Sequence, residues 1–187
     1  TLIELILVVA IVAILAGAII PIVKGAVEDA KVAKILHLTE TLKSACERYY
    51  ADTAEYPREW HNSILAIPPP LLHDLYYANG VVGWDGPYIS NPIDPDDNPY
   101  GEQIRVNDDM SAGDHPFDID GDGIDERAGS GNVLYFYGVP ESAAKKVNDI
   151  VDNHLNDNNW QSRGRVEYYP HFLPNWNCLA IHLLDGR

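Results

Sequence analysis

Residues 1–23 form an almost unbroken apolar run, TLIELILVVAIVAILAGAIIPIV, which constrains the fold more than any other part of the chain. As an α-helix this run extends about 35 Å, enough to cross the hydrocarbon core of a bilayer. Glu4 is its only charged residue. A carboxylate inside a membrane costs on the order of 3 kcal/mol, so Glu4 is expected to have a specific partner. Pro21, near the end of the run, lacks an N–H donor and crowds the preceding helical turn.

The predicted helix continues beyond the apolar run to about residue 52. Residues 24–52 contain no proline and a single glycine, Gly25. Apolar residues recur three and four positions apart in this half, which predicts a buried stripe. The amphipathic half is therefore expected to pack on the rest of the chain, whereas the apolar half needs lipid or identical neighbours. The predicted stripe consists of Ile35, Leu38, Leu42, Ala45 and Tyr49, with Val32, Leu36 and Cys46 on the adjoining face.

The remaining residues predict an α+β head with a small antiparallel sheet, packed on the long helix and connected by long loops. Residues 57–100 are rich in proline and glycine and predict a connecting region, with a short helix at 71–78. Strands are predicted at 132–138, 165–169 and 179–184, and a helix at 140–155. The chain is accordingly divided into a transmembrane and assembly helix, residues 1–53, and a globular head, residues 54–187.

Thr1, Leu2, Ile3 and Glu4, followed by the apolar run and Pro21, resemble the mature N-terminus of type IV pilins and type II secretion pseudopilins. The resemblance covers about the first fifty residues closely, although the usual N-methylated Phe does not precede Thr1 here. Two head segments are similar to the major-pseudopilin stretch Gly-Pro-Tyr…Asp-Pro-Trp-Gly-Asn-Pro-Tyr. They are Gly86-Pro87-Tyr88 and residues 94–100, in which Asp96 and Asp97 replace Trp-Gly.

The resemblance implies that identical chains polymerise through their N-terminal helices. In such a bundle Glu4 pairs with the N-terminal ammonium of a neighbour, here on Thr1, and sets the axial register; a membrane-edge Glu is the alternative. Gly17 and Pro21 are expected to mark where the helix bends or locally melts during assembly, with a mild kink as the alternative. The implied partners are a prepilin peptidase that removes a basic leader, the inner membrane before assembly, and the pilus or secretion machinery.

The charge is unevenly distributed along the chain. The net charge is −15, but residues 1–53 carry five Lys or Arg against six Asp or Glu, and the remainder carries eight against twenty-two. Such an acidic head disfavours nucleic-acid binding, because phosphates would be repelled. The sequence contains no HExxH, GxSxG, P-loop or GxGxxG motif, so an enzyme is not expected.

Residues 118–126, DIDGDGIDE, predict a calcium-type loop near residues 114–126. Acids at alternate positions, then glycine, then a residue offering its carbonyl oxygen match the first seven positions of a calcium loop. The twelfth position is Gly129, so the segment is not an EF-hand, and an exposed acidic turn is the alternative. Major pseudopilins carry a calcium site in this part of the head, and the resemblance implies the same here. The candidate ligands are Asp118, Asp120, Asp122, Ile124, Asp125 and Glu126.

Cys46 and Cys178 are the only cysteines. In an exported protein they are expected to form a disulfide, which would stabilise the fold by about 4–5 kcal/mol in the chain-entropy model. Two separate buried thiols are the alternative.

Three functions are consistent with these features. The leading hypothesis is a major pilin, anchored in the inner membrane before assembly and then part of an extracellular filament on the cell surface. The alternative is the major pseudopilin of a type II secretion system in a periplasmic pseudopilus. A membrane-tethered metal hydrolase is a remote third, because Glu4 and Pro21 would then have no purpose.

Overall fold

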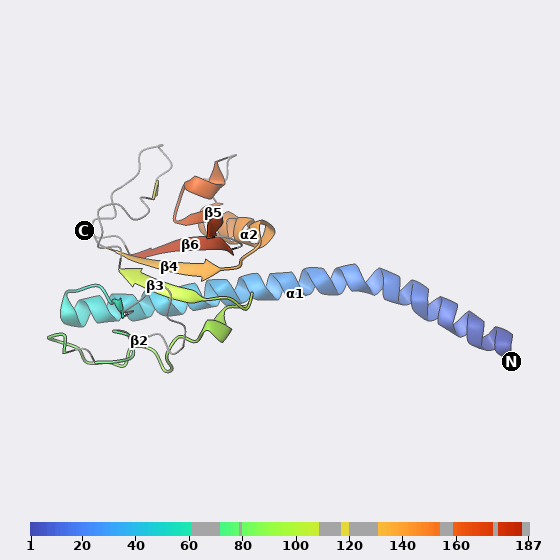
Figure 1. Ribbon diagram of the computed structural model, residues 1–187, viewed down its shortest axis with the longest axis horizontal. Helices are drawn as coiled ribbons and strands as arrows, with labels where there is room; N and C mark the ends of the chain where they lie inside the picture. The colour runs from blue at the N-terminus through green and yellow to red at the C-terminus, as the bar shows by residue number, and fades with distance from the viewer. Residues whose placement is uncertain are drawn as a thin grey trace.

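A single long α-helix, α1 (Leu2–Thr53), organises the computed structural model. The structure describes residues 1–60, 72–78, 80–108, 117–119, 131–153, 159–173 and 176–184. At about 1.5 Å per residue the 52 residues of α1 extend about 78 Å. The head packs on the C-terminal half of α1 only, and the N-terminal half projects away from it (Figure 1). The predicted helix, apolar in its first half and amphipathic in its second, is confirmed.

The head contains a four-stranded antiparallel sheet in the order β3-β4-β6-β5. Its strands are β3 (Ile104–Asp108), β4 (Asn132–Tyr137), β5 (Val166–Leu173) and β6 (Trp176–Leu184). Leu134 of β4 pairs with Ile181 of β6, and Tyr137 pairs with Cys178. The small antiparallel sheet of an α+β head is therefore confirmed, with β5 and β6 longer than the predicted strands and β3 as an additional edge strand.

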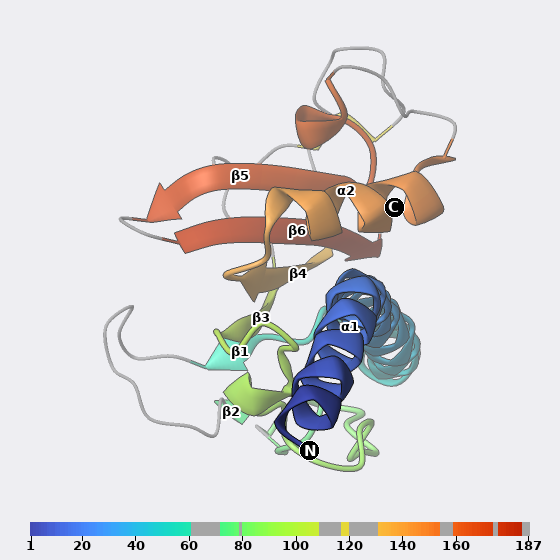
Figure 2. The same ribbon diagram turned by 90° about the vertical axis from the view of Figure 1, so that its right-hand side faces the viewer.

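Both helices cover the same face of the sheet (Figure 2). The second helix, α2 (Glu141–Val151), follows β4 and begins after Pro140, as predicted. It ends at Val151, before the predicted end at residue 155, and residues 154 and 155 lie outside the described residues. The main core joins the two helices to the inward residues of the sheet. It includes Ile35, Leu42 and Tyr49 of α1, Leu134 and Phe136 of β4, Ala144 and Val147 of α2, and Leu179 and Ile181 of β6.

The opposite face of the sheet carries a second, smaller cluster of buried side chains. Because successive residues of a strand point to opposite faces, the residues between those of the main core form this cluster. All six residues of β4 are buried for this reason. The cluster contains Phe117, Val133, Tyr135, Tyr137, Cys178 and Ala180.

The predicted short helix at 71–78 is wrong. Leu72–His73 form strand β2, which pairs antiparallel with β1 (Glu59–Trp60), and turns follow. In the sequence, a proline-rich segment precedes this region. The described residues that follow it contact α1 through the hydrogen bond between Tyr49 and Asp74. Two short 3-10 helices, at Pro95–Asp97 and Trp160–Ser162, complete the described elements.

The buried stripe of α1 differs from the predicted one at a single position. Ile35, Leu42, Ala45 and Tyr49 are buried as expected, together with Val32 and Cys46. Leu38 is only partly buried, and Thr39 takes the buried position. The Thr39 hydroxyl donates to the Ile35 carbonyl at 2.9 Å, so its polar group is satisfied inside the core.

Candidate functional site

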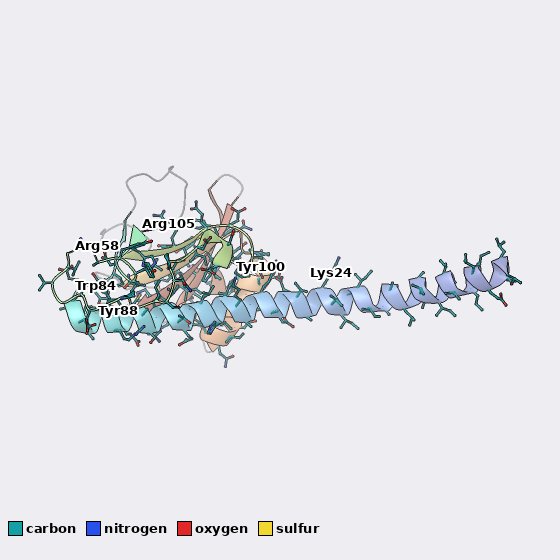
Figure 3. All side chains as sticks on the ribbon, turned by 90° about the horizontal axis from the view of Figure 1, so that it is seen from below. Lys24, Arg58, Trp84, Tyr88, Tyr100 and Arg105 are labelled. Atoms are coloured by element: carbon teal, nitrogen blue, oxygen red, sulfur yellow. The ribbon has the colours of Figure 1, made fainter. Side chains whose placement is uncertain are left out.

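The N-terminal half of α1 presents apolar side chains to solvent on every side (Figure 3). Every residue from 1 to 27 is exposed; Leu2 is 80% exposed and Ile22 is 72% exposed. We refer to residues 2–23 as the apolar rod. Full burial of a Leu or Ile side chain is worth about 1.5–3 kcal/mol, so the rod is strongly driven out of water. By length and composition, α1 is able to cross a membrane.

Glu4 lies one turn into the rod and is paired within its own chain. The Thr1 amino group donates to the Glu4 carboxylate, and the two residues form a capping box at the start of α1. Both side chains are about three-quarters exposed. The structure therefore brings Thr1 and Glu4 together, and the pairing of Glu4 with a neighbouring chain stays a prediction.

Gly17 and Pro21 lie inside α1 without interrupting it. A Cβ atom added at Gly17 would meet nothing within 4 Å, so no packing constraint requires glycine there. The free part of α1 bends away from the direction of the part that packs on the head (Figure 1). Local melting at these two residues stays a prediction.

Residues 80–103, which connect β2 to β3 and which we call the clasping loop, pack on the C-terminal half of α1 on the side away from the sheet (Figures 1 and 2). The Arg48 guanidinium donates to the carbonyl oxygen of Tyr88. The rings of Tyr49 and Tyr88 meet edge to face with centroids 5.4 Å apart, and Trp84 packs edge to face on Tyr88 at 6.0 Å. The Gly86-Pro87-Tyr88 segment thus docks the loop onto the end of α1.

The second pseudopilin-like segment fastens the same loop further along α1. The Asn98 side-chain amide donates to the Tyr137 carbonyl at 2.8 Å and to that of Gln103 at 3.2 Å. The ammonium of Lys31 lies 4.5 Å from the centroid of the Tyr100 ring. Burial raises the pKa of the Tyr100 hydroxyl, and Glu28 of α1 adds to that effect. Asn98 and Tyr100 therefore hold the loop to the sheet and to α1.

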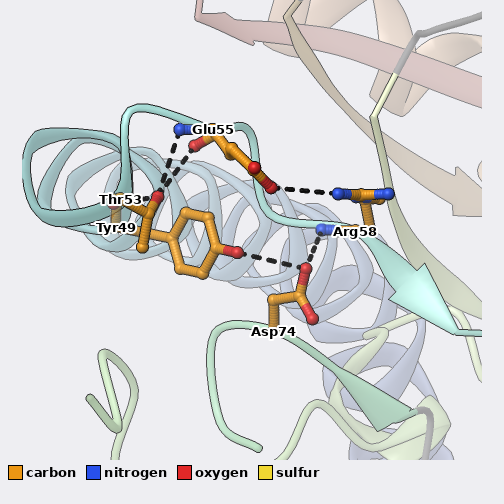
Figure 4. A network of polar contacts seen from close by, with 5 residues as sticks. All are labelled: Tyr49, Thr53, Glu55, Arg58 and Asp74. Atoms are coloured by element: carbon orange, nitrogen blue, oxygen red, sulfur yellow. Dashed lines mark hydrogen bonds and ion pairs between the residues drawn. The ribbon is translucent and has the colours of Figure 1, made fainter. Parts of the chain in front are cut away.

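A buried carboxylate, Asp74, joins α1 to the start of the head (Figure 4). Its Oδ2 atom accepts hydrogen bonds from the Tyr49 hydroxyl at 3.2 Å and from the Arg58 backbone N–H at 3.0 Å. The backbone carbonyl oxygen of Asp74 accepts a hydrogen bond from the indole N–H of Trp84 at 2.8 Å. Burial, followed by the nearby Asp74 charge, raises the pKa of Tyr49, which stays a hydrogen-bond donor at physiological pH.

The structure contradicts the predicted disulfide, because Cys46 and Cys178 are both free. Cys46 is buried in the main core on the α1 side of the sheet, and Cys178 is buried in the small cluster on the opposite face. The sheet therefore separates the two sulfur atoms. Burial raises the pKa of both thiols, that of Cys178 to about 12, so both are protonated and unreactive at neutral pH.

Of the predicted calcium ligands, Asp118 alone lies within the described residues. Asp118 is 3% exposed, and its Oδ2 lies 3.4 Å from Nε of Arg163, with which it forms an ion pair. Among the described residues no group of three or more His, Cys, Asp or Glu side chains is arranged to hold a metal ion. Asp118 is thus placed as an ion-pair partner. The other candidates, Asp120, Asp122, Ile124, Asp125 and Glu126, lie outside the described residues.

Sequence reasoning missed a groove between α1 and α2, which we call the α1/α2 groove. Its first part encloses about 360 Å³ and its neighbouring part about 720 Å³, and the two share Leu36 and Ile150. Ile150 is 60% exposed and lies off the buried face of α2, which is formed by Ala143, Ala144 and Val147. An isoleucine at such a position was the available sequence signal. The first part is lined by Asp29, Val32, Ala33, Leu36, Lys146, Asp149 and Ile150.

Comparison with known proteins places the chain in a family. The model of the family described as PilW, C-terminal matches residues 26–121, from just beyond the apolar rod through the loop that clasps α1. Neither the curated proteins nor the solved structures gave a match. Because the matched residues make up just over half of the 187, this chain belongs to the PilW, C-terminal family, which is related to type IV pilus biogenesis.

Proposed function

We propose that the chain is the main structural subunit of a type IV pilus-like extracellular filament and that it polymerises through the apolar rod. The observation that carries the proposal is the full exposure of residues 1–27 beside a head that buries its own core. A rod of this composition is stable only in lipid or among other apolar helices. Its two environments are then the inner membrane before assembly and the filament core afterwards. Membership of a family related to type IV pilus biogenesis supports this role.

In the filament, Glu4 exchanges its intrachain partner for the N-terminal ammonium of a neighbouring subunit. The exchange costs little, because the present contact is exposed to solvent. A carboxylate buried among apolar helices without a cation would be unstable, so the pair admits only one axial position of the neighbouring rod. Processing by a prepilin peptidase and N-terminal methylation belong to the same proposal.

The test compares Glu4→Ala with wild type in cells, with filaments sheared from the surface and identified by mass spectrometry. We expect filament yield to fall at least tenfold while the chain still inserts in the membrane, since a broken buried ion pair costs about 3–5 kcal/mol. Glu47→Ala, at an exposed position of α1 outside the rod, is the matched control and is expected to assemble normally. Normal yield from Glu4→Ala would contradict the register role.

A specific observation favours a second candidate, the major pseudopilin of a type II secretion system. Gly86-Pro87-Tyr88 and Asn98-Pro99-Tyr100 resemble the pseudopilin stretch, and Arg48, Gln103 and Tyr137 hold them in place. A deletion strain separates the two roles. Loss of surface filaments supports the pilus, whereas blocked protein export without any loss of surface filaments supports the secretion role.

Calcium binding by residues 118–126 is a further part of the proposal, supported by the alternation of acidic residues and glycine. A bound ion stabilises the folded state by RT ln(1 + [Ca]/Kd). Thermal unfolding with and without a chelator tests it, and an unchanged melting temperature would remove calcium from the proposal.

A further inference from the structure

The α1/α2 groove lies where the apolar rod meets the head, and its floor continues the surface of the rod. Ile22, Ala26 and Ala33 are four and seven positions apart in α1, which places them on one face of the helix. Ile22 and Ala26 are exposed, and Ala33 lines the groove. Apolar surface therefore passes from the rod into the groove along a single helix face.

The charged residues at the rim of the first part of the groove form ion pairs. The ammonium of Lys146 lies 2.5 Å from the carboxylate of Asp29, and that of Lys145 lies 2.9 Å from the carboxylate of Asp149. The floor between them consists of Val32, Ala33, Leu36 and Ile150. The first part of the groove thus suits an uncharged apolar occupant, whereas the second part also has Glu40, Lys43, Asp152 and Arg165 in its lining.

We propose that the α1/α2 groove receives the apolar rod of a second copy of this chain. Residues 5–23 of the rod form an exposed apolar helix without charged side chains, and this helix has no packing partner among the described residues. The apolar first part of the groove follows α1 from Asp29 to Leu36, about 11 Å at about 1.5 Å per residue, which accommodates about two turns of the rod. The proposal rests on the proposed filament and assigns α2 a direct role in it.

Cross-linking in assembled filaments locates the occupant. Ile150→Cys is co-expressed with chains that carry one cysteine at each of residues 8–12 of the rod, and a disulfide-forming oxidant is added. The native cysteines remain, because both are buried. We expect cross-linked dimers at rod positions three or four apart and none at the positions between them. Val82→Cys, at a site 89% exposed, replaces Ile150→Cys as the control and is expected to give none.

A second variant tests the contribution of the contact. Ile150→Asp places a charge on the groove floor at an exposed site, so the full-length chain in detergent should melt like wild type. Filament yield is expected to fall at least about tenfold, the factor that corresponds to 1.4 kcal/mol. Val82→Asp, the same change at the control site, is expected to assemble like wild type.

The outcomes separate this inference from the proposed function. If the wild-type chain forms no filaments, the proposed function fails. If wild-type filaments form but Ile150→Cys links to no rod position, or Ile150→Asp assembles normally, only the groove assignment is overturned. That result would indicate that lipid or another protein fills the groove.

Discussion

Asp74 shows how a single buried residue determines the geometry of the head relative to α1. Its carboxylate and backbone bond to Tyr49 of α1, to Arg58 at the start of the head and to Trp84 of the clasping loop. These three residues belong to three different segments of the chain. A carboxylate with 0% exposure is tolerated because it accepts directed hydrogen bonds.

Replacement of Asp74 should therefore destabilise the head as a whole. Asp74→Ala leaves the Tyr49 hydroxyl and the Arg58 N–H without their acceptor, which costs about 3 kcal/mol in the free energy of unfolding. Denaturant unfolding of the detergent-solubilised chain measures the effect. The control is Asp85→Ala, at an exposed site in the clasping loop, which should change the free energy of unfolding by less than about 0.5 kcal/mol. An equal loss in both variants would contradict the role of Asp74.

His73 makes stability depend on pH. It is 2% exposed, its Nδ1 accepts from the Leu75 N–H at 3.2 Å, and its Nε2 has no hydrogen-bond partner among the described residues. Burial lowers its pKa to about 4. The unfolded chain therefore binds the proton more readily than the folded chain, and stability is lost as the pH falls from about 6.5 towards 4.

Protonation of His73 should lower the free energy of unfolding by about 3 kcal/mol in full. This follows from the difference between its pKa values of about 6.5 in the unfolded chain and about 4 in the folded chain, because one pKa unit corresponds to about 1.4 kcal/mol. Unfolding free energies at pH 7 and pH 5 measure the slope, and His73→Gln should flatten it over this interval. An unchanged slope in that variant would assign the pH dependence to other groups.

At the scale of elements, α1 has two halves with different surroundings in one continuous helix. The C-terminal half lies between the sheet and the clasping loop, and the loop approaches it closely at Gly83. Gly83 has φ +89°, and a Cβ atom there would lie 2.3 Å from the carbonyl oxygen of Asp52. Only glycine fits this contact at the end of α1.

Gly83→Ala should therefore loosen the loop from α1. Steric overlap with backbone adds to the strain of a positive φ, and together they should lower the unfolding free energy by about 2–3 kcal/mol. Gly80→Ala is the matched control, since Gly80 also has a positive φ but a Cβ atom there meets nothing within 4 Å. It should cost about 1 kcal/mol, and equal losses at both sites would exclude the contact with Asp52 as the cause.

Elements with a strong repeating pattern were predictable from the sequence, whereas contacts between elements were not. The spacing of Ile35, Leu42 and Tyr49 identified the buried face of α1. Strand β3 was missed because only Ile104 and Val106 are apolar in it and turn formers precede it. The disulfide was predicted wrongly because sequence separation does not reveal which sheet face a cysteine occupies. The groove at Ile150 depends on how α2 packs against α1, and no local pattern specifies that arrangement.

At the scale of the whole molecule, the chain combines a nearly neutral helix with an acidic head. The described ion pair that links the two helices, Lys146 with Asp29, is largely exposed and contributes little to stability. The head is therefore held to α1 mainly by the shared core and by the hydrogen bonds of Asp74 and Arg48. All of these contacts are reversible.

The placement of the two thiols on opposite sheet faces has a mechanical consequence. No covalent bridge ties Cys46 of α1 to Cys178 of β6, so a pulling force between helix and head would be carried by packing and hydrogen bonds alone. We expect the head of a stretched chain to separate from α1 and to dock on it again once the load is released. Single-molecule pulling should record this reversible extension at the same force with and without a reductant; a reductant-sensitive force would instead indicate a covalent tie.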